Sequence, residues 1–261
     1  MKLVSLGCSW TKGSGSGYEF GMSLEQYHAI IKDRDICDKY AFRTHIAKHL
    51  GAENVNLSRM GSSNQRQFRL ATQYFSEKRD PDTIVLWGIT STARHDIYSI
   101  EKKEYVNLLY GNNFAHDKNM EKAGVDTKAY VKNNYDHENE IKQLEYNMKH
   151  WNIFFESLGI KNYWFDTFNH HNYSIKIPNM LFEDRPKRDL MTLLCNHYGL
   201  DSDEWRYHMS QFTMKDSRRL QKLAKAKKVN PHSFHPTKET HVTIAETVSY
   251  THLTLPTNRE V

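Results

Sequence analysis

The sequence predicts an α/β fold in which parallel strands alternate with helices. Three stretches, residues 2–6, 54–57 and 83–90, are predicted to be short strands, and the last is too apolar to have an exposed face. Amphipathic helices are predicted between them, over residues 39–50 and from residue 63 or 64 to about residue 78. Strands separated by helices pair in parallel through right-handed crossovers, so these segments indicate an α/β architecture.

The second half of the chain continues this alternation around a long insertion. Residues 98–136 are polar and rich in asparagine and tyrosine, which predicts an insertion near the carboxyl edge of the sheet. A long amphipathic helix over about residues 141–158 and a fourth strand over residues 161–168 follow it. Two further helices are expected at about residues 185–200 and 217–229, and the second has a basic, solvated face.

Composition and charge exclude several classes of function. The 261 residues carry a formal charge of +5 that is spread along the chain, which does not predict a nucleic-acid-binding protein. The three cysteines, Cys8, Cys37 and Cys195, have no CxxC spacing, so a reducing compartment is predicted rather than a disulfide framework. No apolar stretch approaches the roughly 18 residues of a membrane span, and the first strand begins at residue 2. We therefore expect a cytoplasmic protein without a signal peptide or a membrane segment.

The end of the chain differs in character from the rest. Residues 248–257, Val-Ser-Tyr-Thr-His-Leu-Thr-Leu-Pro-Thr, resemble the translation of a transposase adapter used in DNA libraries. We therefore interpret residues 248–261 as a non-native tail, and we expect that the natural end of the final helix is missing. Residues 1–247 are predicted to form one domain with a sizeable core.

Ser9 is the first candidate for a catalytic residue. It follows the first predicted strand within residues 7–11 (Gly-Cys-Ser-Trp-Thr), and the carboxyl ends of parallel strands are where α/β proteins gather their ligands. A serine there suits a nucleophile, and the alternative is that it only caps a helix or closes a turn. The glycines of residues 12–17 match neither a P-loop nor a dinucleotide fingerprint, so we interpret this segment as a flexible rim loop.

His235 is the candidate base. It begins residues 235–241 (His-Pro-Thr-Lys-Glu-Thr-His), in which Pro236 suits the first position of a helix. His235 is thereby placed on a fixed turn just before that helix, which is a good position for a general base. His241 faces back from the helix, and we interpret it as a packing residue rather than as a catalytic one.

Four separated stretches together resemble the sequence blocks of the SGNH, or GDSL-type, hydrolase superfamily. Residues 7–11 resemble the nucleophile block, residues 56–64 (Asn-Leu-Ser-Arg-Met-Gly-Ser-Ser-Asn) the glycine block, residues 86–90 (Leu-Trp-Gly-Ile-Thr) the third block, and residues 235–241 the histidine block. The resemblance spans residues 2 to about 247. It implies a three-layer αβα sandwich around a five-stranded, flavodoxin-like parallel sheet.

The resemblance also implies the mechanism of a serine esterase. Ser9 would attack the ester carbonyl while His235, within about 3 Å, accepts the proton of its hydroxyl group. The backbone N–H groups of Ser9 and Gly61 would stabilise the oxyanion, together with one side chain. The family supplies an asparagine from its third block for this purpose, and this sequence has Gly-Ile-Thr there, so Asn64 or Thr90 is the candidate donor.

One position near the base departs from the family pattern. The aspartate that usually lies three residues before the histidine is replaced by His232. A histidine does not supply the negative charge that orients His235 and stabilises its protonated ring. The site then works as a Ser-His dyad or with another acceptor, for which a backbone carbonyl and Asp166, at the end of the fourth strand, are the candidates.

The predicted function is an esterase that acts without a cofactor or a metal ion. Its substrate is a small-molecule or carbohydrate ester, and a carbohydrate O-acetyl group suits the polar insertion. The alternatives are a glycan-binding module that keeps the fold without catalysis, and a metal-dependent hydrolase that uses His170, His171 or His232. Arg94, just after the third strand, is expected to form a structural salt bridge, with the binding of an acidic substrate group as the alternative.

Overall fold

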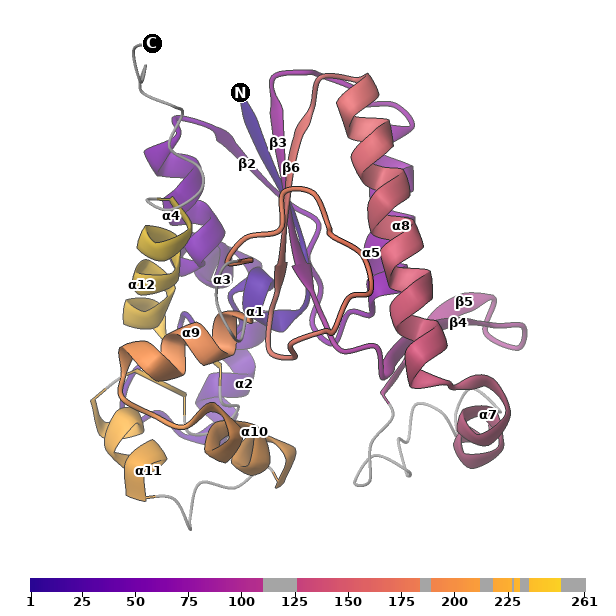
Figure 1. Ribbon diagram of the computed structural model, residues 1–261. Coiled ribbons are helices and arrows are strands. Elements are labelled where there is room, and N and C mark those ends of the chain that lie inside the picture. Colours follow the sequence, from indigo (N-terminus) through magenta and orange to yellow (C-terminus); the bar gives the residue numbers. More distant parts are fainter. Residues whose placement is uncertain (110–125, 184–188, 212–217, 227, 231–234, 250–261) are drawn as a thin grey trace.

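The computed structural model of the protein (Figure 1) describes residues 1–109, 126–183, 189–211, 218–226, 228–230 and 235–249. Its centre is a parallel sheet whose described strands have the order β2-β1-β3-β6. These strands are β1 (Lys2–Leu6), β2 (Glu53–Asn56), β3 (Thr83–Ile89) and β6 (Lys161–Asp166). The α/β class predicted from the sequence is confirmed.

The order of the strands is that of a flavodoxin-like sheet. A short segment runs parallel to the edge strand β6, where Met180 forms an isolated bridge with Trp164. The N–H of Leu181 donates to the carbonyl of Trp164 (2.7 Å), and the N–H of Trp164 donates to the carbonyl of Asn179 (3.1 Å). Among the described residues, this bridge stands where the family resemblance implies a fifth strand.

Helices cover both faces of the sheet, which gives the three layers expected (Figure 1). One face is covered by α4 (Phe42–His49), α9 (Leu190–His197) and α12 (Lys238–Val248). The other face is covered by α5 (Asn64–Phe75) and α8 (His137–Ser157).

Each face of the sheet has its own apolar core. Side chains alternate between the two faces along a strand, so neighbouring residues belong to different cores. Leu3 and Leu86 pack in the core under α4, α9 and α12, whereas Val4 and Trp87 pack in the core under α5 and α8. All seven residues of β3 are buried, as its apolar composition predicts. This double burial holds the carboxyl edge of the sheet in a fixed position.

The helix starts follow the capping rules, with one difference from the prediction. Ser63 caps α5, because its Oγ atom accepts the backbone N–H of Arg66 at 3.1 Å. The helix expected over residues 39–50 corresponds to the shorter α4, and a separate helix that was not predicted, α3 (Arg34–Tyr40), precedes it. The backbone of Ala41 is extended between them (φ −64°, ψ 144°), which ends the first helix and starts the second.

The segment predicted as an insertion contains secondary structure in its described residues, and the hairpin found there begins before residue 98. Its described elements are β4 (Arg94–Ser99), β5 (Glu104–Leu109) and α7 (Thr127–Asn134), against an expected start at residue 98. β4 and β5 form an antiparallel hairpin in which Tyr98 lies opposite Tyr105. Buried Val106 and Leu108 give this region a small core of its own. The aromatic and β-branched residues of a polar segment therefore suffice to form a hairpin.

The remaining described elements are short helices. They are α1 (Ser9–Lys12), α2 (Leu24–Lys32), α10 (Ser202–Gln211) and α11 (Arg218–Lys225). The helices predicted at residues 185–200 and 217–229 correspond to the shorter α9 and α11. Of the helices described, none combines the length and the apolar composition needed to cross a membrane. Residues 250–261, most of the segment interpreted as a tail, lie outside the described residues.

Candidate functional site

Ser9 lies where the first strand turns into a helix. β1 ends at Leu6 and Ser9 is the first residue of α1, so the chain turns sharply at the carboxyl edge of the sheet. A side chain does not fit at Gly7, because its Cβ atom would lie 2.1 Å from the Oγ1 atom of Thr11. The backbone N–H of a first helical residue has no carbonyl partner within its own helix. This turn therefore brings a hydroxyl group and an N–H donor to the edge where ligands bind.

The hydroxyl group of Ser9 meets the predicted base. Ser9 Oγ and His235 Nε2 are 2.6 Å apart, although the two residues are 226 positions apart in the sequence. This distance is that of a hydrogen bond and is short enough for direct proton transfer. Ser9 is only 8% exposed, so the pair sits below the protein surface rather than on it. The structure thus brings together the two residues on which the predicted chemistry depends.

The turn that carries His235 differs from the one predicted. α12 begins at Lys238, so Pro236 is not its first residue and that prediction is wrong. Pro236 instead pairs with Val229 in an isolated antiparallel bridge, and the N–H of Asn230 donates to the carbonyl of His235 at 3.0 Å. The extended backbone needed for this bridge is incompatible with a helix start at Pro236. The bridge and this hydrogen bond together restrict the backbone of His235.

The glycine-rich loop after Ser9 packs directly against His235. A Cβ atom at Gly15 would lie 2.2 Å from the carbonyl oxygen of Pro236 and 2.6 Å from the Cβ atom of His235. Residues 13–17 are buried, so the expectation of a flexible rim loop is wrong. Glycine is required at this position because the two backbones approach too closely for any side chain.

The Gly15→Ala substitution is expected to lower kcat/KM by about 100-fold, since misplacing a catalytic group by about 1 Å costs that much. The added methyl group would push His235 away from Ser9. Ester hydrolysis by purified variants with unchanged circular dichroism measures the effect. Ser14→Ala is the matched control, because it alters the same loop without adding volume. Wild-type kcat/KM in a folded Gly15→Ala variant would show that this contact does not position the base.

The β4–β5 hairpin holds the loop that contains Gly61. The Nδ2 atom of Asn107, in β5, donates to the carbonyl oxygen of Gly61. Gly61 has a positive φ of 65°, a conformation that other residues rarely adopt. The candidate oxyanion donor therefore stands in a loop whose conformation is fixed by the insertion. Asn107 is a residue that the sequence did not reveal, because no local pattern links it to Gly61.

Asn64 and Thr90 have a structural role in addition to the one predicted. The Oδ1 atom of Asn64 accepts the N–H of Thr90 at 2.9 Å, and its Nδ2 atom donates to the carbonyl of Thr90 at 2.9 Å. These bonds tie the start of α5 to the end of β3. The Thr90 N–H is thereby occupied. The second N–H of the Asn64 amide and the buried Thr90 hydroxyl group, which has no hydrogen-bond partner among the described residues, are left as side-chain donors for an oxyanion.

Asp166 pairs with His171 and not with His235, the partner considered for it in the sequence analysis. It is fully buried, and its carboxylate accepts hydrogen bonds from His171 Nδ1 (2.9 Å), the N–H of His171 (3.1 Å) and the hydroxyl of Tyr173 (2.8 Å). None of the bonds of Asp166 goes to His235, so its candidacy as the orienting acid is wrong. His232, at the usual position of the acid, lies outside the described residues.

The histidines proposed as alternative metal ligands are not placed as a set. His171 directs its Nδ1 atom to Asp166, and the neighbouring His170 is half-buried. Across the described ranges, no three His, Cys, Asp or Glu side chains are grouped so as to hold a metal ion. The described geometry therefore gives no support to the metal-dependent alternative.

His241 packs between α12 and α4. Its ring stacks on that of Phe42, with the ring centroids 5.9 Å apart, and its Nδ1 atom accepts the N–H of Phe42 at 3.3 Å. The side chain of His241, in α12, thus caps the first turn of α4, whose own N-cap residue is an alanine. Burial, followed by the charge of His235, lowers the pKa of His241 to about 3. This is the packing role that the sequence predicts.

Acid is expected to destabilise the protein through His241. The pKa of this histidine is near 6.5 in the unfolded chain and about 3 in the folded protein, so protonation favours the unfolded chain. The stabilisation is therefore fully present above pH 6.5 and is lost as the pH falls from 6.5 toward 3. One such group contributes a loss of about 2 kcal/mol between pH 7 and pH 5. Urea unfolding of the wild type and of His241→Asn at both pH values measures it. Equal pH dependence of the two proteins would contradict the assignment, and His197→Asn, at an exposed position, is the control.

Arg94 lies beside Cys8, the residue before Ser9, and does not form the expected salt bridge. No described Asp or Glu pairs with its guanidinium group. The group lies instead over the ring of Phe168, 4.8 Å from the ring centroid.

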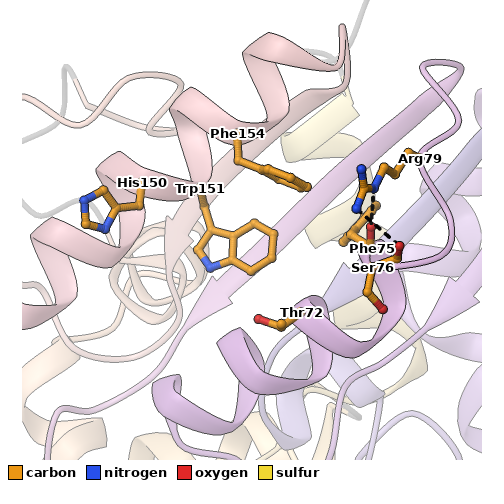
Figure 2. Close-up of a pocket in the computed structure, with 7 residues that line it drawn as sticks. All are labelled: Thr72, Phe75, Ser76, Arg79, His150, Trp151 and Phe154. Atoms are coloured by element: carbon orange, nitrogen blue, oxygen red, sulfur yellow. Dashed lines mark hydrogen bonds between the residues drawn. The ribbon is translucent and has the colours of Figure 1, made fainter.

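A separate pocket of about 330 Å³ lies between α5 and α8 (Figure 2). Figure 2 shows Trp151 and Phe154 projecting from α8 toward α5, where the guanidinium of Arg79 bonds to backbone carbonyls. Its full lining is Thr72, Phe75, Ser76, Arg79, His150, Trp151 and Phe154. The pocket is at the carboxyl end of α5, whereas Asn64 at the amino end faces the sheet edge. None of the predicted site residues lines it.

Comparison with protein-family models and with curated proteins gives no match to the chain. The arguments about function therefore rest on the geometry of the site and on the sequence blocks themselves.

Proposed function

We propose that the protein is a serine esterase of the SGNH type, which transfers an acyl group from an ester to water. The observation that carries the proposal is the 2.6 Å separation of Ser9 Oγ and His235 Nε2 at the carboxyl edge of a parallel sheet. The order of the four sequence blocks and the flavodoxin-like order of the strands support it.

The chemistry follows from this contact. His235 accepts the proton of Ser9 as the hydroxyl oxygen attacks the ester carbonyl, and then donates a proton to the leaving alcohol. This produces an acyl-enzyme on Ser9. Water, deprotonated by the same ring, then attacks the acyl group and releases the acid and the free hydroxyl of Ser9. One base therefore serves both halves of the reaction.

Backbone donors at the sheet edge are suited to the oxyanion. The Ser9 N–H lies at a helix start, and Gly61 lies in a loop anchored by Asn107. A preorganised donor of this kind lowers the barrier by roughly 3 to 4 kcal/mol. The second N–H of the Asn64 amide is the side-chain donor nearest to the family pattern.

Packing contributes to the position of His235. The close contact with Gly15 and the bridge between Pro236 and Val229 restrict the backbone that carries the imidazole. These contacts hold the ring of His235 toward Ser9, a task to which the aspartate contributes in a triad. The buried position of Ser9 favours a small acyl group, and we propose a carbohydrate O-acetyl ester as the substrate class.

Covalent labelling with a fluorophosphonate probe tests the proposal. An activated serine attacks the phosphorus, so mass spectrometry of the digested protein is expected to find the adduct on the peptide that contains Ser9. Heat-denatured protein and Ser9→Ala are the controls, and both are expected to remain unlabelled. A folded wild-type protein that does not react would contradict the proposal and would favour the glycan-binding module without catalysis.

A further inference from the structure

A cation lies next to the proposed nucleophile. Arg94 is the first residue of β4, and its guanidinium lies beside Cys8, the residue before Ser9. The same group lies 4.8 Å from the centroid of the Phe168 ring. Phe168 in turn contacts Trp10, the residue after Ser9, with ring centroids 6.2 Å apart. The guanidinium of Arg94 therefore lies among side chains that contact the two chain neighbours of Ser9.

The protein supplies few acceptors for this cation. The Nε and Nη1 atoms of Arg94 are buried and have no hydrogen-bond partner among the described residues. Two other buried or half-buried arginines show the opposite arrangement. All three guanidinium nitrogens of Arg43, and all three of Arg206, donate to oxygen atoms of the protein. Arg66 and Arg69 each have one such buried nitrogen, their Nε atom, whereas Arg94 has two among the described residues.

Cys8 is a polar neighbour of the Arg94 guanidinium, but a thiol brings no negative charge and leaves Nε and Nη1 without an acceptor. A buried cation in this arrangement is unfavourable, so its presence calls for a reason. Burial lowers the pKa of Arg94, but a guanidinium group remains protonated near neutral pH. Arg94 is half-buried as a whole, so part of it stays accessible from solvent. An anion that enters the site would provide both the missing acceptors and the missing charge.

We propose that Arg94 binds a carboxylate group of the substrate, so that Ser9 acts on an anionic ester. This inference rests on the proposed esterase function and narrows its substrate class. A carboxylate matches a single guanidinium in charge, and its two oxygen atoms accept two parallel N–H···O bonds. The ring of Phe168 holds the guanidinium by a cation–π contact and keeps it from turning away.

Matched pairs of esters test the proposal on both sides of the scissile bond. 7-Acetoxycoumarin and its 3-carboxylate differ by one carboxylate in the alcohol, and p-nitrophenyl butyrate and mono-p-nitrophenyl succinate differ by one in the acyl group. We expect the wild type to prefer the charged member of at least one pair. In Arg94→Gln, the ratio of kcat/KM for the charged and neutral esters is expected to fall about 30-fold, as for the loss of a charged hydrogen bond.

Control variants separate this role from a structural one. Arg79→Gln removes an arginine at the far end of α5 and is expected to leave the ratio unchanged. Arg94→Lys keeps the positive charge but lacks the paired N–H groups of the guanidinium, so it is expected to give an intermediate ratio of kcat/KM. It replaces Arg94→Gln if that variant does not fold. The proposal is overturned if the wild type has the same kcat/KM for the charged and the neutral ester in both pairs. It is also overturned if the ratio of these kcat/KM values is the same in the Arg94 variants as in the wild type.

A binding measurement distinguishes this proposal from the esterase proposal. At least one of the two intact charged esters is expected to bind the Ser9→Ala protein in equilibrium dialysis, and the Ser9→Ala, Arg94→Gln double variant is expected to bind that ester about 30-fold more weakly. If the wild type hydrolyses no ester but this difference is found, the catalytic proposal fails and the anion site stands. If esters are hydrolysed but binding is independent of Arg94, the anion site fails alone.

Discussion

Replacement of Ser9 by alanine is expected to lower kcat for p-nitrophenyl acetate by at least about 10³-fold, as the loss of a serine nucleophile does in other hydrolases. The substitution removes only the Oγ atom, which lies 2.6 Å from His235 Nε2. The turn itself depends on Gly7 and on the following helix, so the fold is expected to be retained. Steady-state kinetics and circular dichroism of the purified proteins measure both effects.

A second serine provides the matched control for this experiment. Ser76 is exposed at the carboxyl end of α5, where its hydroxyl donates to the carbonyl of Gln73 at 2.9 Å. Ser76→Ala is expected to keep the wild-type kcat. Retention of more than about a tenth of the wild-type rate by folded Ser9→Ala would show that the hydrolysis does not use this serine.

Replacement of His235 by alanine is expected to lower kcat/KM by about 10²- to 10⁴-fold, the range typical for loss of a general base. The proton of Ser9 then has no acceptor at hydrogen-bond distance in the site as described. Most of the loss is expected in kcat rather than in KM, because the ring meets the reacting hydroxyl group and not the remote parts of the substrate. Kinetics over a range of ester concentrations separate the two constants.

Chemical rescue shows whether the His235 ring acts as a base or only as packing. The alanine variant leaves a space of the size of the ring, so free imidazole is expected to restore part of kcat in a concentration-dependent manner. His197→Ala, at an exposed position on α9, is the control and is expected to show neither loss nor rescue. An inactive His235→Ala protein that imidazole does not rescue, with altered circular dichroism, would point to a structural role.

Local patterns in the sequence predicted most of the central fold. The continuous apolar run that became β3 identified a doubly buried strand, and Ser63 identified the start of α5. The polar insertion was harder to interpret, because the residues of β4 and β5 find their partners in each other rather than in the main core. Hydrophobic periodicity therefore did not predict its hairpin.

The site was predicted in part for a similar reason. Ser9 and His235 each stand in a recognisable block, so their meeting was foreseen. The contact of Gly15 with His235 and the bond from Asn107 to Gly61 join segments that are distant in the sequence, and no local spacing encodes them. Arg94 was misjudged because a sequence shows the charge but not whether a carboxylate lies within reach.

The long separation of Ser9 and His235 along the chain has a consequence for folding. The 226 positions between them mean that the proposed site is incomplete during synthesis until the segment with His235 has emerged and closed a very long loop. The base is carried just before α12, which is held to α4 partly by the bond between His241 and Phe42. Local opening of α12 separates His235 from Ser9 while the sheet stays intact. If the proposed function is correct, hydrolysis is expected to be lost before the helical signal during gradual denaturation, and the rate of hydrolysis reports how firmly α12 is docked.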